Sequence, residues 1–408
     1  MSDADGINPG KVREVFESSR DFTVGLEEEF ALLDPETLDL VPEFERFEAA
    51  ALRDPVLADS IAGELISSEI EIRSGRAESF GDAVERQAER RARLFGLAPT
   101  VGVELGAMGV HPWASYLDQQ IIDTPHYRRV RDELRWVAQR NNTWSLHLHM
   151  GIRGADRAIA VCDHLRGVLP LLLAISANSP WLDGHDTGLA SVRTQIFTRT
   201  FPRCGIPEAF GDWEGYARFV ELLARTGSIV EPTQLWWSVR PHHLFGTVEV
   251  RICDAQSDGG DSTALAGLIA ATIAQLALDY DRFGYASDEA AGGGAAARRA
   301  APFGPGAGSP PRGREIEENL WRAIRYGVGG EMIDFSRGEA EPTLRMAERL
   351  FEWTEPAREL LGIETEPPRA SGAEAFRALV AETGSVREAY RETLERTRLG
   401  YAGGAPVS

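Results

Sequence analysis

Lysine is almost absent from this 408-residue sequence: Lys11 is the single lysine, and the rest of the 43 basic residues are arginines. A GxxxxGK[ST] phosphate loop, a Schiff-base mechanism and kinase-type phosphate binding each need a lysine inside the fold. Lys11 lies in residues 1–20, an N-terminal lead that we expect to be loose. The sequence therefore excludes those chemistries and leaves arginine, backbone amides or a metal to hold an anion.

Cysteines and long apolar runs are also few. The three cysteines, Cys162, Cys204 and Cys253, are far apart and odd in number, which excludes a disulfide framework and a CxxC zinc site. No run of about eighteen apolar residues stands out, so we expect no transmembrane helix. Residues 1–20 are polar and acidic without an apolar stretch, so we expect no secretory signal. These features predict a cytoplasmic protein.

Positive charge is in deficit, with 63 acidic residues against 43 basic ones and a net charge of -20. Such a chain is a poor general binder of nucleic acid or of an anionic membrane. The hydrophobic content of 43% is ordinary and sufficient for a large core. The composition therefore favours a globular protein with small-molecule substrates, and it leaves a homo-oligomer open.

The order of the expected elements indicates an α+β fold, with strands in the first two-thirds and helices at the end. We expect four domain-level segments: the lead at 1–20, a catalytic domain at 21–286, a Gly/Ala/Pro-rich insertion at 287–314, and C-terminal helices at 315–400 that pack on the same domain. Residues 155–178 read as a long helix bent near Pro170. Strands are expected at 21–33, 38–42, 65–74, 100–110, 143–153, 235–240 and 246–254.

Four of these strands place ionisable side chains on one face, because residues i and i+2 of a strand point the same way. One such strand alone would be an ordinary half-exposed strand. Four together are different, since solvated strand faces usually carry Thr, Ser, Lys and Gln. The residues that share the face are Glu27 and Glu29; Glu69, Glu71 and Arg73; His147 and His149; and Glu249 and Arg251.

If these strands form one sheet, the carboxylates repel one another and a divalent cation relieves the repulsion. Glutamate oxygens with few histidines suit Mg²⁺ or Mn²⁺ better than zinc. Carboxylates at i and i+2 lie roughly 6.5–7 Å apart, so they could serve two metals. Mg²⁺ shared between carboxylates and phosphates is the usual arrangement at a nucleotide site.

Three arginines are candidates for binding phosphate or a substrate carboxylate. Arg251 shares a strand face with Glu249, and the alternative is that it only neutralises Glu249 in an ion pair. Arg193 follows a polar loop at 186–193, and the alternative is a surface arginine behind a helix cap. Arg240 follows a Trp-Trp pair at 236–237, of which at least one ring is expected in the core.

The same residues resemble the bacterial carboxylate–amine ligase family, also called type 2 glutamate–cysteine ligases. The likeness runs from about residue 22 to residue 280. Glu28 departs from it, standing where relatives often carry an apolar residue, and Ser238 stands where they often carry Asp. The matching segments are Gly25–Phe30, Ser68–Arg73, His147–Gly151, Ser176–Pro180, Asp186–Arg193, Trp236–Pro241 and Phe245–Arg251.

The resemblance implies a glutamine-synthetase-like fold, in which helices cover one face of a curved antiparallel sheet. It implies ATP, Mg²⁺ (or Mn²⁺) and an often weak ligation of the L-glutamate γ-carboxylate to L-cysteine through an acyl phosphate. The catalytic candidates are then Arg251, Arg193 and Arg240, with Arg251 and Arg240 also binding the nucleotide. The metal candidates are Glu27, Glu29, Glu71, His147, His149 and Glu249.

Two alternatives remain open at this point. One is a ligase or phosphotransferase that acts on a different amine. The other is a metal- or nucleotide-binding protein that has lost catalysis.

Overall fold

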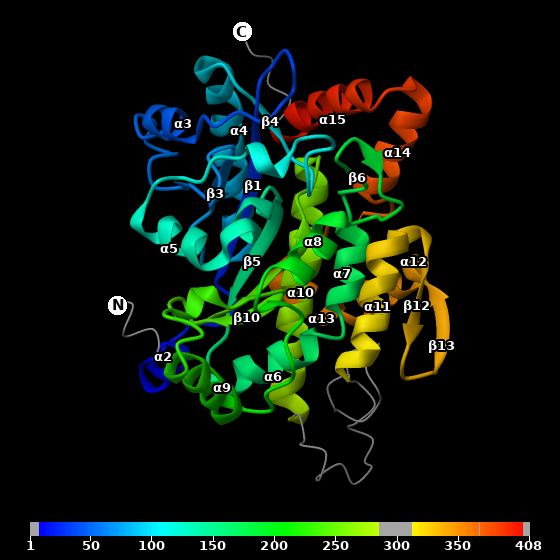
Figure 1. The fold of residues 1–408 in the computed structure, drawn as a ribbon. Helices are drawn as coiled ribbons and strands as arrows, with labels where there is room; N and C mark the ends of the chain where they lie inside the picture. The colour runs from blue at the N-terminus through cyan, green and yellow to red at the C-terminus, as the bar shows by residue number, and fades with distance from the viewer. Residues whose placement is uncertain (1–7, 285–311, 367, 403–408) are drawn as a thin grey trace.

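The computed structural model describes residues 8–284, 312–366 and 368–402. A seven-stranded sheet lies at its centre, in the order β10-β11-β5-β1-β3-β2 with β4 paired to β1, and every strand pair in it is antiparallel (Figure 1). The α+β class expected from the sequence is confirmed. The strands of this sheet are β1 Val24–Leu33, β2 Ile61–Ala62, β3 Glu69–Arg73, β4 Glu104–Gly106, β5 Ser145–Gly151, β10 Val239–His242 and β11 Thr247–Asp254.

Helices cover one face of the sheet, because alternate strand residues on that face are apolar. Leu26 of β1, Leu148 of β5 and Val250 of β11 are buried in the main core. Helices α4, α6, α7 and α10 pack on β1, β10, β11 and β5 (Figure 1). Their bounds are α4 Phe80–Val101, α6 Ala155–Leu165, α7 Leu169–Ser176 and α10 Gly259–Phe283.

Helix α10 is long and apolar enough to cross a membrane by length and composition alone. Its most apolar window is 83% buried inside the protein, as befits the central helix of a core. The bend expected near Pro170 is confirmed, since α6 and α7 meet at 59° and Pro170 lies in the first turn of α7.

The N-terminal lead was expected to be loose, and where the structure describes it, this expectation is wrong. Residues Pro9–Glu17 form helix α2, whose first amides are capped by the Asn8 side chain. Val12 and Phe16 are one helical turn apart and buried, and the Phe16 ring lies 5.7 Å from that of Trp213. This apolar i, i+4 pair explains why the segment docks.

Two further expectations fail locally. The strand expected at 100–110 shrinks to β4, because α4 continues to Val101 and ends at Gly102, whose φ of 77° suits glycine. A β-hairpin, β12 Glu331–Asp334 and β13 Glu339–Pro342, interrupts the C-terminal helices. Residues 287–311 of the expected insertion lie outside the described residues, and its last two residues begin helix α11.

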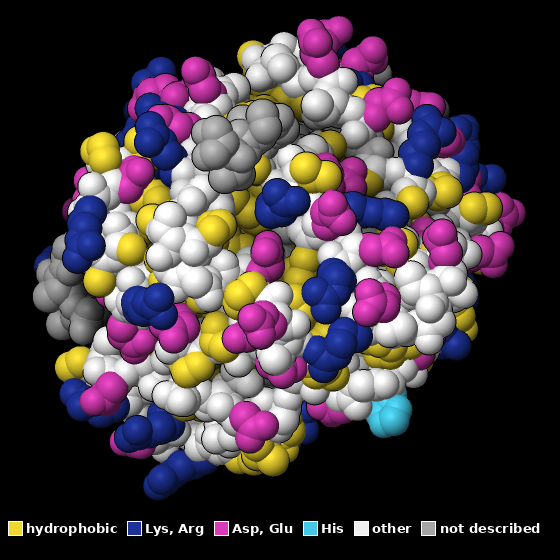
Figure 2. Space-filling model, turned by 90° about the horizontal axis from the view of Figure 1, so that it is seen from above, with side chains coloured by type: hydrophobic (Ala, Val, Ile, Leu, Met, Phe, Trp, Pro, Cys, Tyr) yellow, Lys and Arg dark blue, Asp and Glu magenta, His cyan; other side chains and the backbone are white. Residues whose placement is uncertain are grey.

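The C-terminal helices pack on the same core: α11 and α12 contact α7, while α13 and α15 contact α10. Charged side chains of both signs are interspersed over the face in Figure 2, so no single-sign patch dominates that view. The remaining elements are α3 Phe44–Ala51, η1 Tyr116–Asp118, α5 Pro125–Leu134, η2 Arg135–Arg140, β6 Trp181–Leu182, β7 His185–Asp186, α8 Val192–Thr200, β8 Cys204–Gly205, α9 Trp213–Arg225, η3 Pro232–Gln234, β9 Trp236–Trp237, α11 Gly313–Tyr326, η5 Gly327–Gly329, α12 Thr343–Trp353, α13 Glu355–Leu361, α14 Gly372–Thr383 and α15 Val386–Tyr401.

Candidate active site

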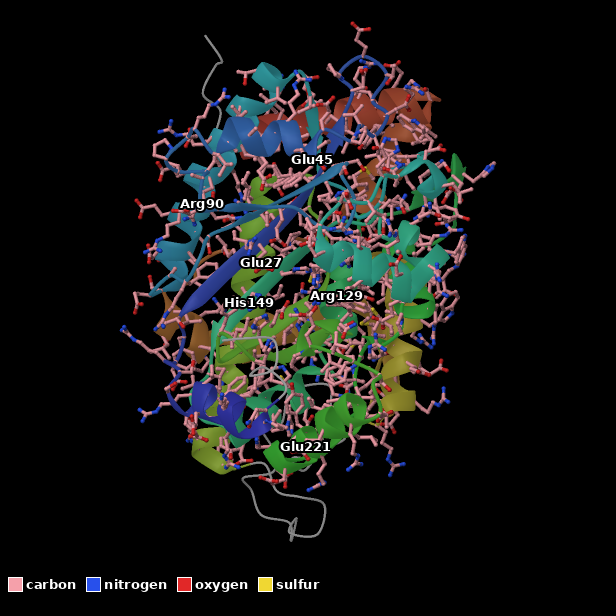
Figure 3. All side chains as sticks on the ribbon, turned by 60° about the vertical axis from the view of Figure 1, so that its left-hand side comes forward. Glu27, Glu45, Arg90, Arg129, His149 and Glu221 are labelled. Carbon is pink, nitrogen blue, oxygen red and sulfur yellow. The ribbon has the colours of Figure 1, made fainter. Side chains whose placement is uncertain are left out.

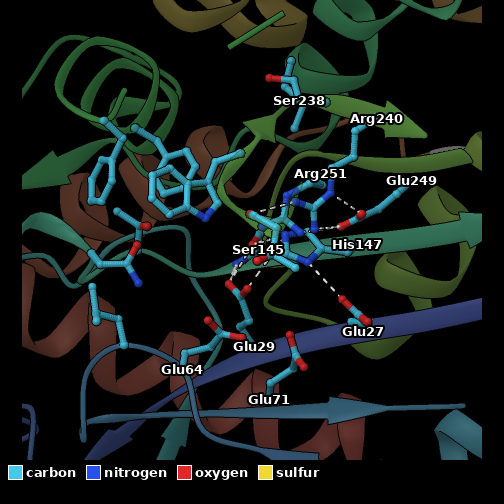
Figure 4. Close-up of a pocket in the computed structure, with 18 of the residues that line it drawn as sticks. Glu27, Glu29, Glu64, Glu71, Ser145, His147, Ser238, Arg240, Glu249 and Arg251 are labelled. Carbon is cyan, nitrogen blue, oxygen red and sulfur yellow. Dashed lines mark hydrogen bonds and ion pairs between the residues drawn. The ribbon is translucent and has the colours of Figure 1, made fainter. Parts of the chain in front are cut away.

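A cavity of about 350 Å³ lies on the polar face of the sheet, opposite the helical core (Figure 4). Strands β1, β3, β5 and β11 supply most of its carboxylates, two imidazoles and the guanidinium groups of Arg73 and Arg251, and residues of α5 and α8 line it as well. All nine candidate site residues from the sequence analysis line this one cavity: Glu27, Glu29, Glu71, His147, His149, Arg193, Arg240, Glu249 and Arg251.

Strand register brings these side chains together. Glu27 of β1 stands opposite His147 of β5, and Glu249 of β11 stands opposite His149. Glu29 stands opposite Glu71 of β3. Directly opposed residues have Cβ atoms about 5 Å apart, so each pair faces the cavity as neighbours.

Two groups of side chains have the geometry of metal ligands. Glu27, His147 and Glu249 form one, and Glu29, Glu71 and His147 form the other; within each group the ligand atoms lie within 4.8 Å of one another. Carboxylate oxygens with one imidazole suit Mg²⁺ or Mn²⁺. The residues present therefore fit a divalent cation of this kind.

His149 lies beside the first group rather than in it. Its Nε2 is 3.4 Å from Glu27 Oε1 and 3.7 Å from Glu249 Oε1, while Nδ1 is hydrogen-bonded to the Thr247 hydroxyl at 3.0 Å. Figure 3 shows Glu27 and His149 together in the interior of the protein. Burial alone would lower the pKa of His149, but Glu249 and Glu27 outweigh it and raise that pKa. The two carboxylates therefore favour the protonated, cationic form of the His149 imidazole.

The β3 side of the cavity is crowded with carboxylates. Burial, followed by the charge of Glu29, raises the pKa of Glu64 to about 7. Burial and the surrounding carboxylates also raise the pKa values of Glu69 and Glu71 well above their usual range. Glu69 is 1% exposed, and its Oε2 has no hydrogen-bond partner among the described residues. This side of the cavity is short of positive charge.

The β10–β11 side has the opposite balance. Burial would raise the pKa of Glu249, but Arg240 and then Arg251 lower it well below the usual range. Arg240 donates from Nε to Glu249 Oε2 at 2.6 Å, and Arg251 donates from Nη1 to Glu249 Oε1. The ion pair considered as the alternative role for Arg251 is thus present. Its Nε is buried without a partner in the described residues and remains for a second acceptor.

Arg193 enters the site from α8 and binds the backbone of β11. Its Nη1 and Nη2 donate to the carbonyls of Ile252 and Arg251 at 3.1 and 3.3 Å. Asp254 is the buried last residue of β11, and its Oδ1 lies 3.6 Å from Nη1. Nε has no partner among the described residues. These contacts make Arg193 a positioning residue for β11 in the ligand-free protein, and its expected role in anion binding stays a prediction.

The sequence analysis missed several lining residues. Ser145 donates from its amide and its hydroxyl to Glu29 Oε2 at 2.5 and 2.6 Å, and the alternation of β5 could have found it two residues before His147. Glu64 lies outside the strands, so no period marks it. His242 and Phe245 stack at 4.3 Å with ring planes 8° apart. Ser238 also lines the cavity.

Comparisons with known proteins agree with this chemistry. A family model described as "Glutamate-cysteine ligase family 2 (GCS2)" matches residues 23–301. A "Putative glutamate–cysteine ligase 2-2" of Rubrobacter xylanophilus is 37% identical over 379 residues, covering 92% of this chain and 91% of the relative. A "Putative glutamate–cysteine ligase 2" of Sorangium cellulosum is 34% identical over 407 residues, covering 98% and 100%.

The fold has a solved counterpart. A glutamate–cysteine ligase of Francisella tularensis, solved in complex with AMP, superposes with a TM-score of 0.61. The superposition covers 94% of this chain and 90% of that one at 12% identity, so it shows likeness of fold.

The matches and the cavity together define the class of an ATP-dependent ligase that forms an amide bond. Within that class, the chain belongs to glutamate–cysteine ligase family 2, as its motifs had indicated.

Proposed function

We propose that this protein joins the γ-carboxylate of L-glutamate to an amine at the expense of ATP, with L-cysteine as the amine that the family name suggests. The observation that supports this most directly is that the two metal-ligand groups, which share His147, lie in the same cavity as Arg240 and Arg251. Cations and anions must meet in such a site, as they do when a nucleotide is bound with its metal.

The aromatic end of the cavity suits the base of the nucleotide. Phe245 is 57% exposed, and its ring stacks on His242 and meets His149 edge-on at 5.7 Å. The exposed side of the Phe245 ring would stack on the purine of a nucleotide. The phosphates of that nucleotide would then point toward Arg240 and Arg251. We assign Phe245 to this stacking role.

The reaction would run in two steps. The ATP γ-phosphorus bonds to a glutamate γ-carboxylate oxygen and ADP leaves. The amine nitrogen then bonds to the carbonyl carbon, inorganic phosphate leaves with the C–O electron pair, and the nitrogen loses a proton. When bound, Mg²⁺ neutralises phosphate charge, and Glu27, Glu249, Glu29, Glu71 and His147 would hold it.

Protein side chains would supply orientation and proton transfer. Arg251, with Nε unpartnered, would bind the transferred phosphoryl or the glutamate carboxylate. Glu64 faces the same cavity with a pKa of about 7, which suits a base that accepts the proton of the attacking amine. A glutamine-synthetase-like curvature of the sheet, a cytoplasmic location and a homo-oligomer remain predictions.

The test is ATP consumption by the full-length protein with Mg²⁺, measured with glutamate alone, amine alone, and both together. Consumption that needs both supports the ligase. Consumption with glutamate alone indicates acyl-phosphate formation with a different amine as the acceptor. Nucleotide binding without consumption in every mixture would contradict the proposal and favour a binding protein.

A further inference from the structure

We infer that the amine acceptor preferred by this protein carries a bulky apolar substituent, so that cysteine is a weaker substrate; this inference rests on the proposed ligase function. It concerns the part of the cavity that is lined by the β3 carboxylates and by residues of helices α5 and α8.

This end has an apolar wall. Several of its side chains belong to one hydrophobic cluster that closes the cavity from the α5, η2 and α8 side. Phe197 and Phe201 stack at 4.7 Å, and Trp236 meets Phe201 edge-on at 6.4 Å. Unlabelled aromatic rings gather at the upper left of Figure 4. The lining members of the wall, which we call the acceptor wall, are Leu65, Tyr127, Val130, Leu134, Phe197, Phe201 and Trp236.

The acceptor wall adjoins the carboxylates that would attract an ammonium group. Leu65 follows Glu64 in the chain, and the Tyr127 hydroxyl donates to the Gly63 carbonyl at 2.6 Å. Glu69 lines the same cavity, and its Oε2 is buried without a hydrogen-bond partner among the described residues. Carboxylates beside an apolar wall are the complement of an amine that has a cationic head and an apolar body.

Size separates this acceptor from cysteine. A cysteine side chain ends one atom beyond its Cβ, so it would cover a small part of a wall built from seven side chains. Tyr127, Phe197 and Trp236 are only partly buried, so the area of these rings that cysteine leaves uncovered would stay in contact with water. That contact is unfavourable in proportion to the area. A leucine-sized or phenylalanine-sized group would displace that water. Both an α-amino acid and a simple amine present this chemistry.

The experiment is a panel of acceptors supplied to the full-length protein with ATP, Mg²⁺ and L-glutamate, with products identified by mass spectrometry. The panel contains cysteine, glycine, leucine, phenylalanine, isoamylamine and phenethylamine. We expect kcat/KM for the best apolar acceptor to exceed that for cysteine by about 10-fold or more. The two amines distinguish a free amine from an amino acid as the source of the apolar group.

A pair of variants ties the preference to the acceptor wall. Phe197→Ala should lower kcat/KM for phenylalanine by roughly 10-fold and for glycine by less than about 2-fold. Phe197→Leu, which keeps apolar volume, should restore most of the loss. Phe219→Ala is the matched control, because Phe219 packs on Trp237 at 5.9 Å and does not line the cavity. It should leave the ratio of the two acceptors unchanged.

The outcomes separate the two proposals. Ligation with cysteine equal to or better than every apolar acceptor overturns this inference and leaves the ligase function standing. The same holds if Phe197→Ala affects glycine as much as phenylalanine. Absence of ligated product and of ATP consumption with every acceptor overturns both.

Discussion

Both faces of β1 carry glutamates, but these glutamates differ in the partners that surround them. Glu28 points to the helices and is fully paired: Arg91 donates to it from Nε and Nη2 at 2.6 and 2.7 Å, and Gln87 and Ser262 donate at 2.9 and 2.5 Å. Glu27 and Glu29, one residue to either side, point into the cavity. There they meet histidines and other carboxylates.

This difference separates a structural charge from a functional one. Burial would raise the pKa of Glu28, but Arg91 outweighs it and the pKa is lowered, so the pair is complete without a ligand. On the cavity face, burial and then the neighbouring carboxylates raise the pKa values of Glu64, Glu69 and Glu71, and the nearby arginines do not fully compensate. A buried charge that the fold leaves uncompensated marks the place where a ligand completes the site.

Metal removal should have the largest effect on ligase activity, because it acts on the glutamates of the cavity face and leaves Glu28 unaffected. Chelation with EDTA is expected to lower ligase activity by at least about 100-fold, because the phosphates then lose their main neutralising charge. Adding Mg²⁺ or Mn²⁺ back should restore it. Initial-rate assays measure the loss, and full activity in the metal-free protein would refute the metal-site assignment.

Breaking the helix-facing pair should affect stability rather than chemistry. Glu28→Ala leaves Arg91 buried and uncompensated, so we expect a loss of about 3–5 kcal/mol in the free energy of unfolding. The double variant Glu28→Met/Arg91→Met replaces the pair by apolar volume and should lose much less. Urea denaturation measures both, and equal losses in the two proteins would show that the charge pair is not the cause.

Arg251→Lys tests the anion-binding role on the cavity face. Lysine keeps the charge next to Glu249 but loses the planar fork, so kcat/KM is expected to fall roughly 10- to 1000-fold with Tm nearly unchanged. Arg377→Lys is the matched control, since Arg377 pairs through two nitrogens with Asp186 outside the cavity. Near-wild-type turnover of the Arg251→Lys variant would contradict the anion-binding role and leave Arg251 with only its ion pair to Glu249.

The smallest expected effect is a pH dependence of the metal-free protein. Glu64 has a folded pKa of about 7, above its unfolded value, so the folded state binds its proton more tightly. That stability is present below about pH 4.5 and is lost as the pH rises through about 7, by about 1.4 kcal/mol for each pH unit between the two pKa values. Denaturation curves at several pH values measure it. Glu64→Gln should flatten this slope, and an unchanged slope would assign it to other groups.

The period of two along the strands was enough to predict the chemistry of the cavity. Because successive strand side chains alternate, Glu27 with Glu29 and His147 with His149 had to share faces once the strands formed one sheet. The α+β class followed from the order of the elements. Local signals failed where packing decided, as in the docking of α2 through Phe16 and the extension of α4 over an expected strand.

What the sequence by itself determined is which side chains share a face, since that depends on neighbours two residues apart. Only the tertiary structure decided which charges are satisfied, because those contacts join distant segments. Arg91 and Ser262 reach Glu28 across 63 and 234 positions, and no local period encodes such a meeting. The acceptor wall was equally hidden, since its residues come from α5, α8, β9 and the segments beside them, and no single strand carries them. The reason is physical: alternation is a local property of the backbone, whereas compensation of a buried charge depends on everything packed around it.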